Sequence, residues 1–150
     1  MNVFLAVVRD IGLLVARLTL GAVLVVHGWH RFTTGIAPTV AVLTDAALPE
    51  PQLFAWGATI LEVVGGALLV FGLLTPIVAA FVVAEQVMVI VWLRWHNGIW
   101  NINNGIEYPV VLAVLAFVLV VFGSGRTGVD ALFWRGRKTA TPRSYVGTSA

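Results

Sequence analysis

Residues 59–72, TILEVVGGALLVFG, have the sequence of a membrane helix interior except for one charged residue. The stretch places the carboxylate of Glu62 near the centre of an apolar run over residues 53–74. A helix needs about 20 apolar residues to cross about 30 Å of hydrocarbon, and this run is long enough. The stretch therefore predicts a membrane-spanning helix with a carboxylate at mid-depth.

The composition of the whole chain is that of a membrane protein. Its 150 residues are 59% hydrophobic and 11% charged, and the mean hydropathy is +0.96, outside the range of ordinary soluble domains. A soluble fold of this size buries only about 60 to 70% of its surface, too little to hide so many apolar side chains. The sequence has no cysteine, which excludes disulfides, thiol catalysis and thiolate metal sites.

Four apolar segments are long enough to cross a bilayer, and they cover residues 11–29, 53–74, 76–95 and 108–123. We therefore predict an all-α integral membrane four-helix bundle formed by residues 1–134. Pro76 suits the first turn of a helix, so the second and third spans should form a tight antiparallel hairpin. The first segment lacks the features of a cleaved signal peptide, so we expect it to be a retained span.

The basic residues predict the orientation. With four spans both termini lie on one side, and that side carries Arg9 and five basic residues after the last span, whereas the other carries only Arg31 and Arg94. The positive-inside rule then places both termini in the cytoplasm. Residues 129–138, VDALFWRGRK, predict a short interfacial C-terminal helix, and residues 135–150 a basic, disordered tail. These charges should meet lipid headgroups and not nucleic acid.

Three charged residues fall near the middle of the predicted spans. Glu62 and Glu85 lie near the centres of the second and third, and Arg17 lies near the centre of the first. A lone charge at the bilayer centre costs about 3 kcal/mol, so such residues face the bundle interior and pair. We expect Arg17 to contact Glu62, Glu85 or both. One arginine cannot neutralise two carboxylates, so one of them should bind a proton or a ligand.

Helical spacing predicts a polar pocket above this charge cluster. In an α-helix Glu85 shares a face with Met88, Trp92 and His96, so an aromatic stripe should lead from the midplane to the outer surface. Amide, imidazole and carboxylate side chains would surround its mouth. The predicted ligand-binding residues are Arg17, His27, Glu62, Glu85, Trp92, His96, Asn97 and Glu107.

Each of these features also has a structural interpretation. A buried ion pair can simply fix the register of two helices, and interfacial tryptophans and histidines can form an aromatic belt. His27 and His30 have a spacing that can chelate, but no metalloenzyme motif accompanies them, so we predict no metal site. The chain also has no phosphate loop, dinucleotide fingerprint, nucleophile elbow or haem motif. We therefore expect no intrinsic cofactor and no self-contained catalytic centre.

Five motifs occur in order along the chain: HGWHRF (27–32), LEVVGGALLVFGLLTP (61–76), WHNG (95–98), NNGIEYP (103–109) and GSGRTGVDALFW (123–134). Together they resemble the DoxX family of small bacterial and archaeal membrane proteins, over about residues 11–134. The resemblance implies a four-helix bundle in the bacterial plasma membrane and an association with redox systems. Relatives are linked to thiosulfate:quinone oxidoreductase, to terminal quinol oxidase, and to a membrane complex with superoxide dismutase and a sulfurtransferase.

The resemblance also implies which polar residues recur in the family, and Glu85 and His30 are not among them. By position they are Arg17, His27, Glu62, His96, Asn97 and Glu107.

Three functions remain open from the sequence. The first is a redox-linked membrane subunit that binds a quinone or a similar small molecule in the predicted pocket. The second is a noncatalytic anchor or assembly subunit of a larger complex. The third is a proton-coupled transporter of a small solute, which would need a homo-oligomer because four short helices alternate access poorly. In each case the lipid bilayer and other protein subunits are the expected partners.

Overall fold

The computed structural model describes residues 3–125 and 128–130, and this part of the chain is helical with no β-strand. The predicted interfacial C-terminal helix and the basic tail fall almost entirely outside the described residues. In chain order the elements are α1 (Val3–Thr34), α2 (Ala37–Asp45), α3 (Pro51–Ile60), η1 (Leu61–Gly65), α4 (Gly66–Phe71), α5 (Thr75–Met88), η2 (Val89–Arg94), η3 (Trp95–Asn97), η4 (Asn101–Asn103) and α6 (Glu107–Phe122). Of these, η1 and η2 are π-helical, and η3 and η4 are short 3-10 turns.

Three helical stretches are long and apolar enough to cross a membrane: α1 with 32 residues, Pro51–Phe71 with 21 and Thr75–Asn97 with 23. The helical, membrane-type fold is therefore confirmed. α6 is apolar but has only 16 residues, so the count of four spans stays a prediction. α1 extends beyond the predicted segment at both ends, because it begins at Val3 and ends at Thr34.

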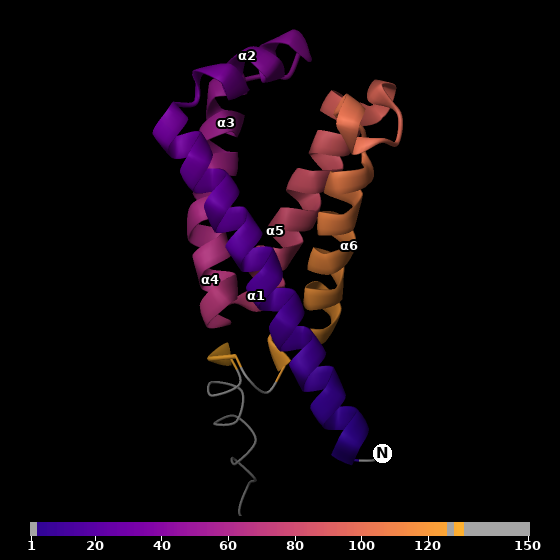
Figure 1. Cartoon of the computed structure of the whole chain (residues 1–150). Coiled ribbons are helices and arrows are strands. Elements are labelled where there is room, and N and C mark those ends of the chain that lie inside the picture. The colour runs from indigo at the N-terminus through magenta and orange to yellow at the C-terminus, as the bar shows by residue number, and fades with distance from the viewer. Residues whose placement is uncertain (1–2, 126–127, 131–150) are drawn as a thin grey trace, which may run out of the picture.

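The long helices form two pairs (Figure 1). α1 packs along η1 and α4, and α5 packs along α6. The pairs lie close together near the α4–α5 turn and diverge toward α2 (Figure 1). The core of the close half consists of apolar side chains from all the long helices: Leu13, Leu20, Leu24, Leu69, Val78, Ala79, Val82, Leu112, Ala116 and Leu119.

Two glycines allow α1 and α4 to approach closely. A Cβ atom added to Gly21 would lie 2.8 Å from the carbonyl oxygen of Gly66, and one added to Gly66 would lie 2.9 Å from that of Gly21. These distances are too short for real side chains. The glycine pair therefore fixes where along its length α1 meets the second span.

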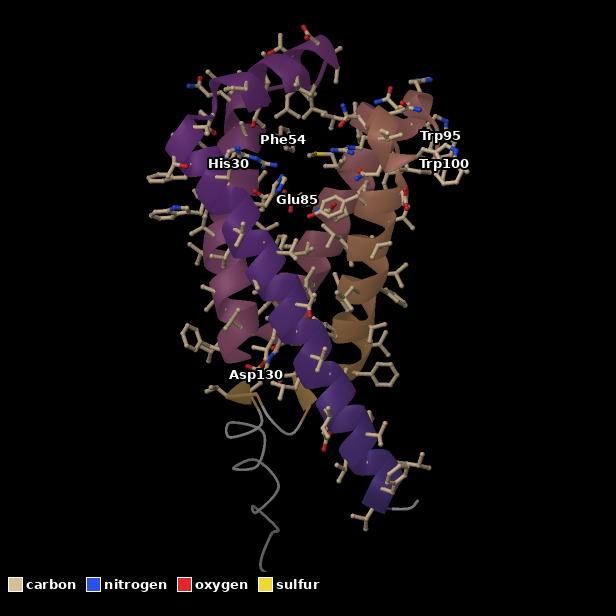
Figure 2. The ribbon with its side chains drawn as sticks, in the orientation of Figure 1. His30, Phe54, Glu85, Trp95, Trp100 and Asp130 are labelled. Atoms are coloured by element: carbon tan, nitrogen blue, oxygen red, sulfur yellow. The ribbon has the colours of Figure 1, made fainter. Side chains whose placement is uncertain are left out.

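The second and third spans are joined by a tight turn, as predicted, but they belong to different helix pairs and diverge beyond it, so they do not pack as a tight antiparallel hairpin (Figure 1). Gly72, with φ of +70°, ends α4 in the left-handed conformation, which glycine adopts without strain. α5 then begins with Pro in its first turn. The two Asp130 carboxylate oxygens accept hydrogen bonds from the backbone N–H groups of Leu74 (2.8 Å) and Thr75 (2.9 Å), and these bonds hold the segment after α6 against the turn (Figure 2).

The connection between the first two spans contains the helix α2, which the sequence analysis did not predict. Leu43 of α2 is 4% exposed. It belongs to a second apolar cluster with Leu48 and Ala55, against which Met88 and Leu93 pack. We call these five residues the apolar lid. Because its members come from α2, the turn after it, α3, α5 and η2, the lid joins the two helix pairs at their divergent end.

Candidate functional site

A cavity lies between the two helix pairs, on the α2 side of the main core. Its volume is about 70 Å³, which is room for about two water molecules at about 30 Å³ each. Four helices contribute to its walls. The lining residues are Leu24, His27, Arg31, Glu62, Glu85, Gln86, Val89, Arg94, Tyr108, Pro109 and Leu112.

Glu62 is buried at the wall of this cavity and forms an ion pair with Arg31. Glu62 Oε2 lies 3.2 Å from Arg31 Nη1, and the two side chains are 4% and 21% exposed. The same oxygen has no hydrogen bond of good geometry among the described residues, so the contact is an ion pair without an aligned hydrogen bond. Gly28 makes room for the glutamate, since a Cβ atom there would lie 2.7 Å from Glu62 Cβ.

Glu85 brings a second carboxylate to the cavity. Its Oε2 atom is buried and has no hydrogen-bond partner within the part of the chain that the structure describes. Figure 2 shows its side chain in the space between the helix pairs, and Glu85 interacts electrostatically with both Glu62 and Arg31. A buried carboxylate oxygen without a partner is costly. The cavity therefore holds an acceptor that a ligand hydroxyl, a water molecule or a proton could satisfy.

The remaining polar residues of the cavity can all donate hydrogen bonds. Arg94 belongs to η2 and donates one hydrogen bond to the carbonyl oxygen of Gly105 at 3.3 Å. Tyr108 lies in the first turn of α6, Gln86 is 6% exposed, and His27 interacts electrostatically with Arg31 and Arg94. Two carboxylates thus share one small space with two guanidinium groups, an amide, a phenol and an imidazole.

Arg17 is not part of this site, and the expectation that it contacts Glu62 or Glu85 is wrong. It is 3% exposed and donates a hydrogen bond from Nη1 to the carbonyl oxygen of Ser124 at 3.2 Å. It also interacts electrostatically with Asp130. Arg17 and Arg31 are 14 residues apart on α1, about 21 Å along a helix, so they serve opposite ends of the bundle.

This error follows from the placement of α1. The sequence analysis centred the first span on residues 11–29, which brought Arg17 near the level of the glutamates. In the structure Gly28, and not Arg17, lies level with Glu62. The residue that pairs with Glu62 is therefore Arg31, one turn further along, whose long side chain reaches back toward the bundle centre.

The presence of two arginines changes the charge balance as well. The sequence predicted a single arginine to neutralise the two carboxylates, but two arginines, Arg31 and Arg94, line the cavity. The formal charges of the four groups therefore cancel. The site can therefore bind a hydrogen-bond donor because Glu85 Oε2 has no partner among the described residues, and not because the site carries an excess of negative charge.

Four predicted residues at the mouth do not reach the cavity. Trp92, His96, Asn97 and Glu107 are exposed and absent from its lining. Asn97 donates to the carbonyl oxygen of Asn104 (3.3 Å), and Glu107 accepts from the backbone N–H of Asn101 (3.1 Å). These two side chains close the loop before α6. Of the predicted site, the structure brings together His27, Glu62 and Glu85.

The π-helix η2 explains why Arg94 lines the cavity and the predicted residue Trp92 does not. In an α-helix a residue nine positions after Glu85 lies about 180° around the axis from it, and one seven positions after lies nearly on the same side. A π-turn takes in one residue more than an α-turn. Through Val89–Arg94 this extra residue turns Arg94 toward the cavity and Trp92, which is 52% exposed, away from it.

Sequence reasoning missed Arg31, Gln86, Arg94 and Tyr108. The two arginines were counted only as charges of the outer loops, although long side chains at helix ends reach inward to buried carboxylates. The sequence gives no comparable signal for Tyr108, which lines the cavity from the first turn of α6. Glu62 itself lies in the other π-helix, η1, and π-helical turns often occur at functional sites. Within the described residues no group of three or more potential metal ligands occurs.

A helical membrane protein with a charged cavity among its helices is the class that this fold and site define. The chain belongs to the DoxX family, small membrane proteins, because the model of that family matches residues 12–95. The matched region includes Arg31, Glu62, Glu85 and Arg94, whereas Tyr108 and the 123–134 motif lie beyond it.

One relative has a name that refers to an activity. The chain is 26% identical over 129 residues to "Putative oxidoreductase CatD" of Bacillus subtilis (strain 168), and the match covers 86% of this chain and 92% of the relative. No solved structure gives a significant match.

Proposed function

We propose that this chain is a membrane subunit of an oxidoreductase system and that its cavity binds the polar head of a quinone-like molecule. Membership of the DoxX family and the similarity to a protein named as an oxidoreductase support the first part. Quinone binding rests on one observation: Oε2 of Glu85 is buried without a hydrogen-bond partner among the described residues, in a cavity otherwise rich in donors.

The donor and acceptor set suits such a head group. Arg94, Tyr108 and Gln86 can donate hydrogen bonds to a carbonyl oxygen, and the Glu85 carboxylate can accept one from a hydroxyl. The cavity therefore offers partners to both the carbonyl and the hydroxyl form of the same ring. A bound quinone would supply the electron-accepting chemistry, since the chain itself has no cysteine and no haem or nucleotide motif.

In this proposal, other protein subunits exchange electrons with the bound quinone. A chain without its own redox group needs a partner to deliver or receive electrons. The mid-helix surface offers ample contact area, because many large apolar side chains, including Val64, Phe81 and Phe117, are more than 50% exposed. We assign this surface to lipid and to partner subunits in the bacterial plasma membrane, with both termini cytoplasmic.

The test begins with the protein extracted in native lipid nanodiscs. Mass spectrometry of the purified particles should report a quinone at a stoichiometric level, together with copurifying redox subunits. Labelling with a photoactivatable azidoquinone should then modify peptides from α1, η2 and the start of α6. Excess decylubiquinone should suppress that labelling.

Variants separate the cavity from nonspecific adsorption. Glu85→Gln and Tyr108→Phe should each reduce the protected labelling, whereas Val114→Leu on the lipid-facing side of α6, where Val114 is 59% exposed, should leave it unchanged. Labelling that is spread over lipid-facing peptides and unaffected by these variants would contradict quinone binding. If redox chains still copurified, the anchor function would then explain the protein better.

A further inference from the structure

Apolar layers border the cavity toward both ends of the bundle. The apolar lid lies toward α2, where its members Met88 and Leu93 adjoin the lining residues Val89 and Arg94 in the chain. Toward the α4–α5 turn the main core begins directly below Leu24 and Leu112, which line the cavity and belong to that core. The buried core therefore closes this end of the cavity to water.

The open side of the cavity lies between α1 and α6. Two of its walls are formed by residues of these helices, such as His27 and Tyr108, and the helices diverge toward the α2 end (Figure 1). His27 is exposed and Tyr108 is half-buried. The exposed edge of the polar cavity therefore lies on the side of α1 and α6.

Exposed apolar side chains flank this opening. Val26, next to His27 on α1, is 70% exposed, and Val111, one turn after Tyr108 on α6, is 60% exposed. Both lie within the predicted membrane spans, where such side chains contact the hydrocarbon of the bilayer. A molecule at the opening would therefore come from the membrane.

We propose that the cavity takes its ligand from the bilayer, through a lateral opening between α1 and α6. The ligand is then a membrane-dissolved molecule with a hydrogen-bonding head, whose head enters the cavity while its apolar remainder stays in lipid. The small volume of about 70 Å³ agrees with this division. The inference rests on the proposed function for the use of the cavity and adds the class and route of its ligand.

Spin-label accessibility tests the route without any ligand. The chain has no cysteine, so Val89→Cys places a single label on the cavity wall. Reference labels define the collision rates expected in lipid and in water. One is at Val114, which faces lipid, and the other is at Asn103, an exposed loop residue. In nanodiscs, the ratio of collisions with oxygen to collisions with a water-soluble nickel chelate should resemble that at Val114 and exceed that at Asn103 several-fold.

A plugging variant with a matched neighbour sharpens the test. His27→Trp should fill the opening and lower the oxygen collision rate at the Val89 label several-fold. Val26→Trp adds the same side chain one residue away, on the lipid-facing surface, and should leave that rate unchanged. If Val89→Cys does not fold, a label at Leu112 on the facing wall of the cavity gives the same readout.

The outcomes separate this inference from the proposed function. Nickel collisions at the cavity label as frequent as at Asn103 would show a route to water and overturn the lateral opening. Collisions with neither reagent would overturn it as well, because the cavity would then be sealed. A lipid-like ratio without any quinone labelling would support the opening and contradict quinone binding alone.

Discussion

Arg31 Nη1 lies 3.2 Å from Glu62 Oε2, so the glutamate buried in the second span is paired with an arginine from the end of α1 and not from its middle. Glu62 is 3% exposed, and Gly28 leaves the space that its side chain occupies. This ion pair connects the two helices of the first pair directly at the cavity. Its removal should therefore affect both stability and the site.

We predict that Arg31→Leu destabilises the protein by about 3 to 5 kcal/mol, because it leaves the buried Glu62 charge without a partner. The double variant Arg31→Leu with Glu62→Leu should recover most of this loss. Thermal unfolding of the purified protein, followed by size-exclusion chromatography, measures both. His30→Leu, at the exposed neighbour of Arg31 on the same helix, serves as the control. A single variant as stable as wild type would refute the pairing.

The two glutamates should respond differently to neutralisation. Glu62→Gln deprives Arg31 of its partner and should lower the melting temperature clearly. Glu85→Gln removes a carboxylate that forms no ion pair among the described residues, so the stability change should stay below about 1 kcal/mol. The same melting experiment compares them. Equal losses for both variants would show that Glu85 is also an essential ion-pair partner.

Asp130 should stabilise the start of α5. Its carboxylate accepts hydrogen bonds from two N–H groups that lack partners within the helix, so Asp130→Ala should cost about 0.5 to 2 kcal/mol. Asp130→Asn keeps one acceptor oxygen and should recover part of the loss. Amide hydrogen exchange at Leu74 and Thr75 reports the effect locally. Unchanged exchange in Asp130→Ala would contradict the capping role.

The glycine contact between α1 and α4 gives a steric prediction. Gly21→Val would force its side chain against the Gly66 backbone and should destabilise the bundle by about 1 to 3 kcal/mol. Gly12→Val on the same helix is the matched control, because nothing lies within 4 Å of an added Cβ there. Equal melting temperatures for the two variants would refute the close contact.

The orientation is testable in intact cells. Asn103→Cys, in the loop before α6, should react with a membrane-impermeant maleimide added from outside. Val3→Cys, at the 80% exposed start of α1, should react only after permeabilisation. The opposite pattern would reverse the topology that the positive-inside rule predicts.

The sequence by itself determined the class of fold and the inward orientation of Glu62. Long apolar runs form helices in lipid because every backbone polar group must be satisfied within the segment. A glutamate in such a run turns inward because hydrocarbon offers it no partner, as Glu62 does. Pro76 marked the start of α5 for the same kind of local reason, since it suits the first turn of a helix.

The tertiary structure decided which groups meet. The Gly21–Gly66 contact sets the position of α1 along its neighbour, and that position pairs Glu62 with Arg31 and leaves Arg17 near Asp130. The π-helix η2 turns Arg94 inward and Trp92 outward. Helical periodicity gives the faces of one regular helix, but it contains neither the offset between two helices nor an extra residue in a turn. Both arise from packing, and packing therefore defined the site.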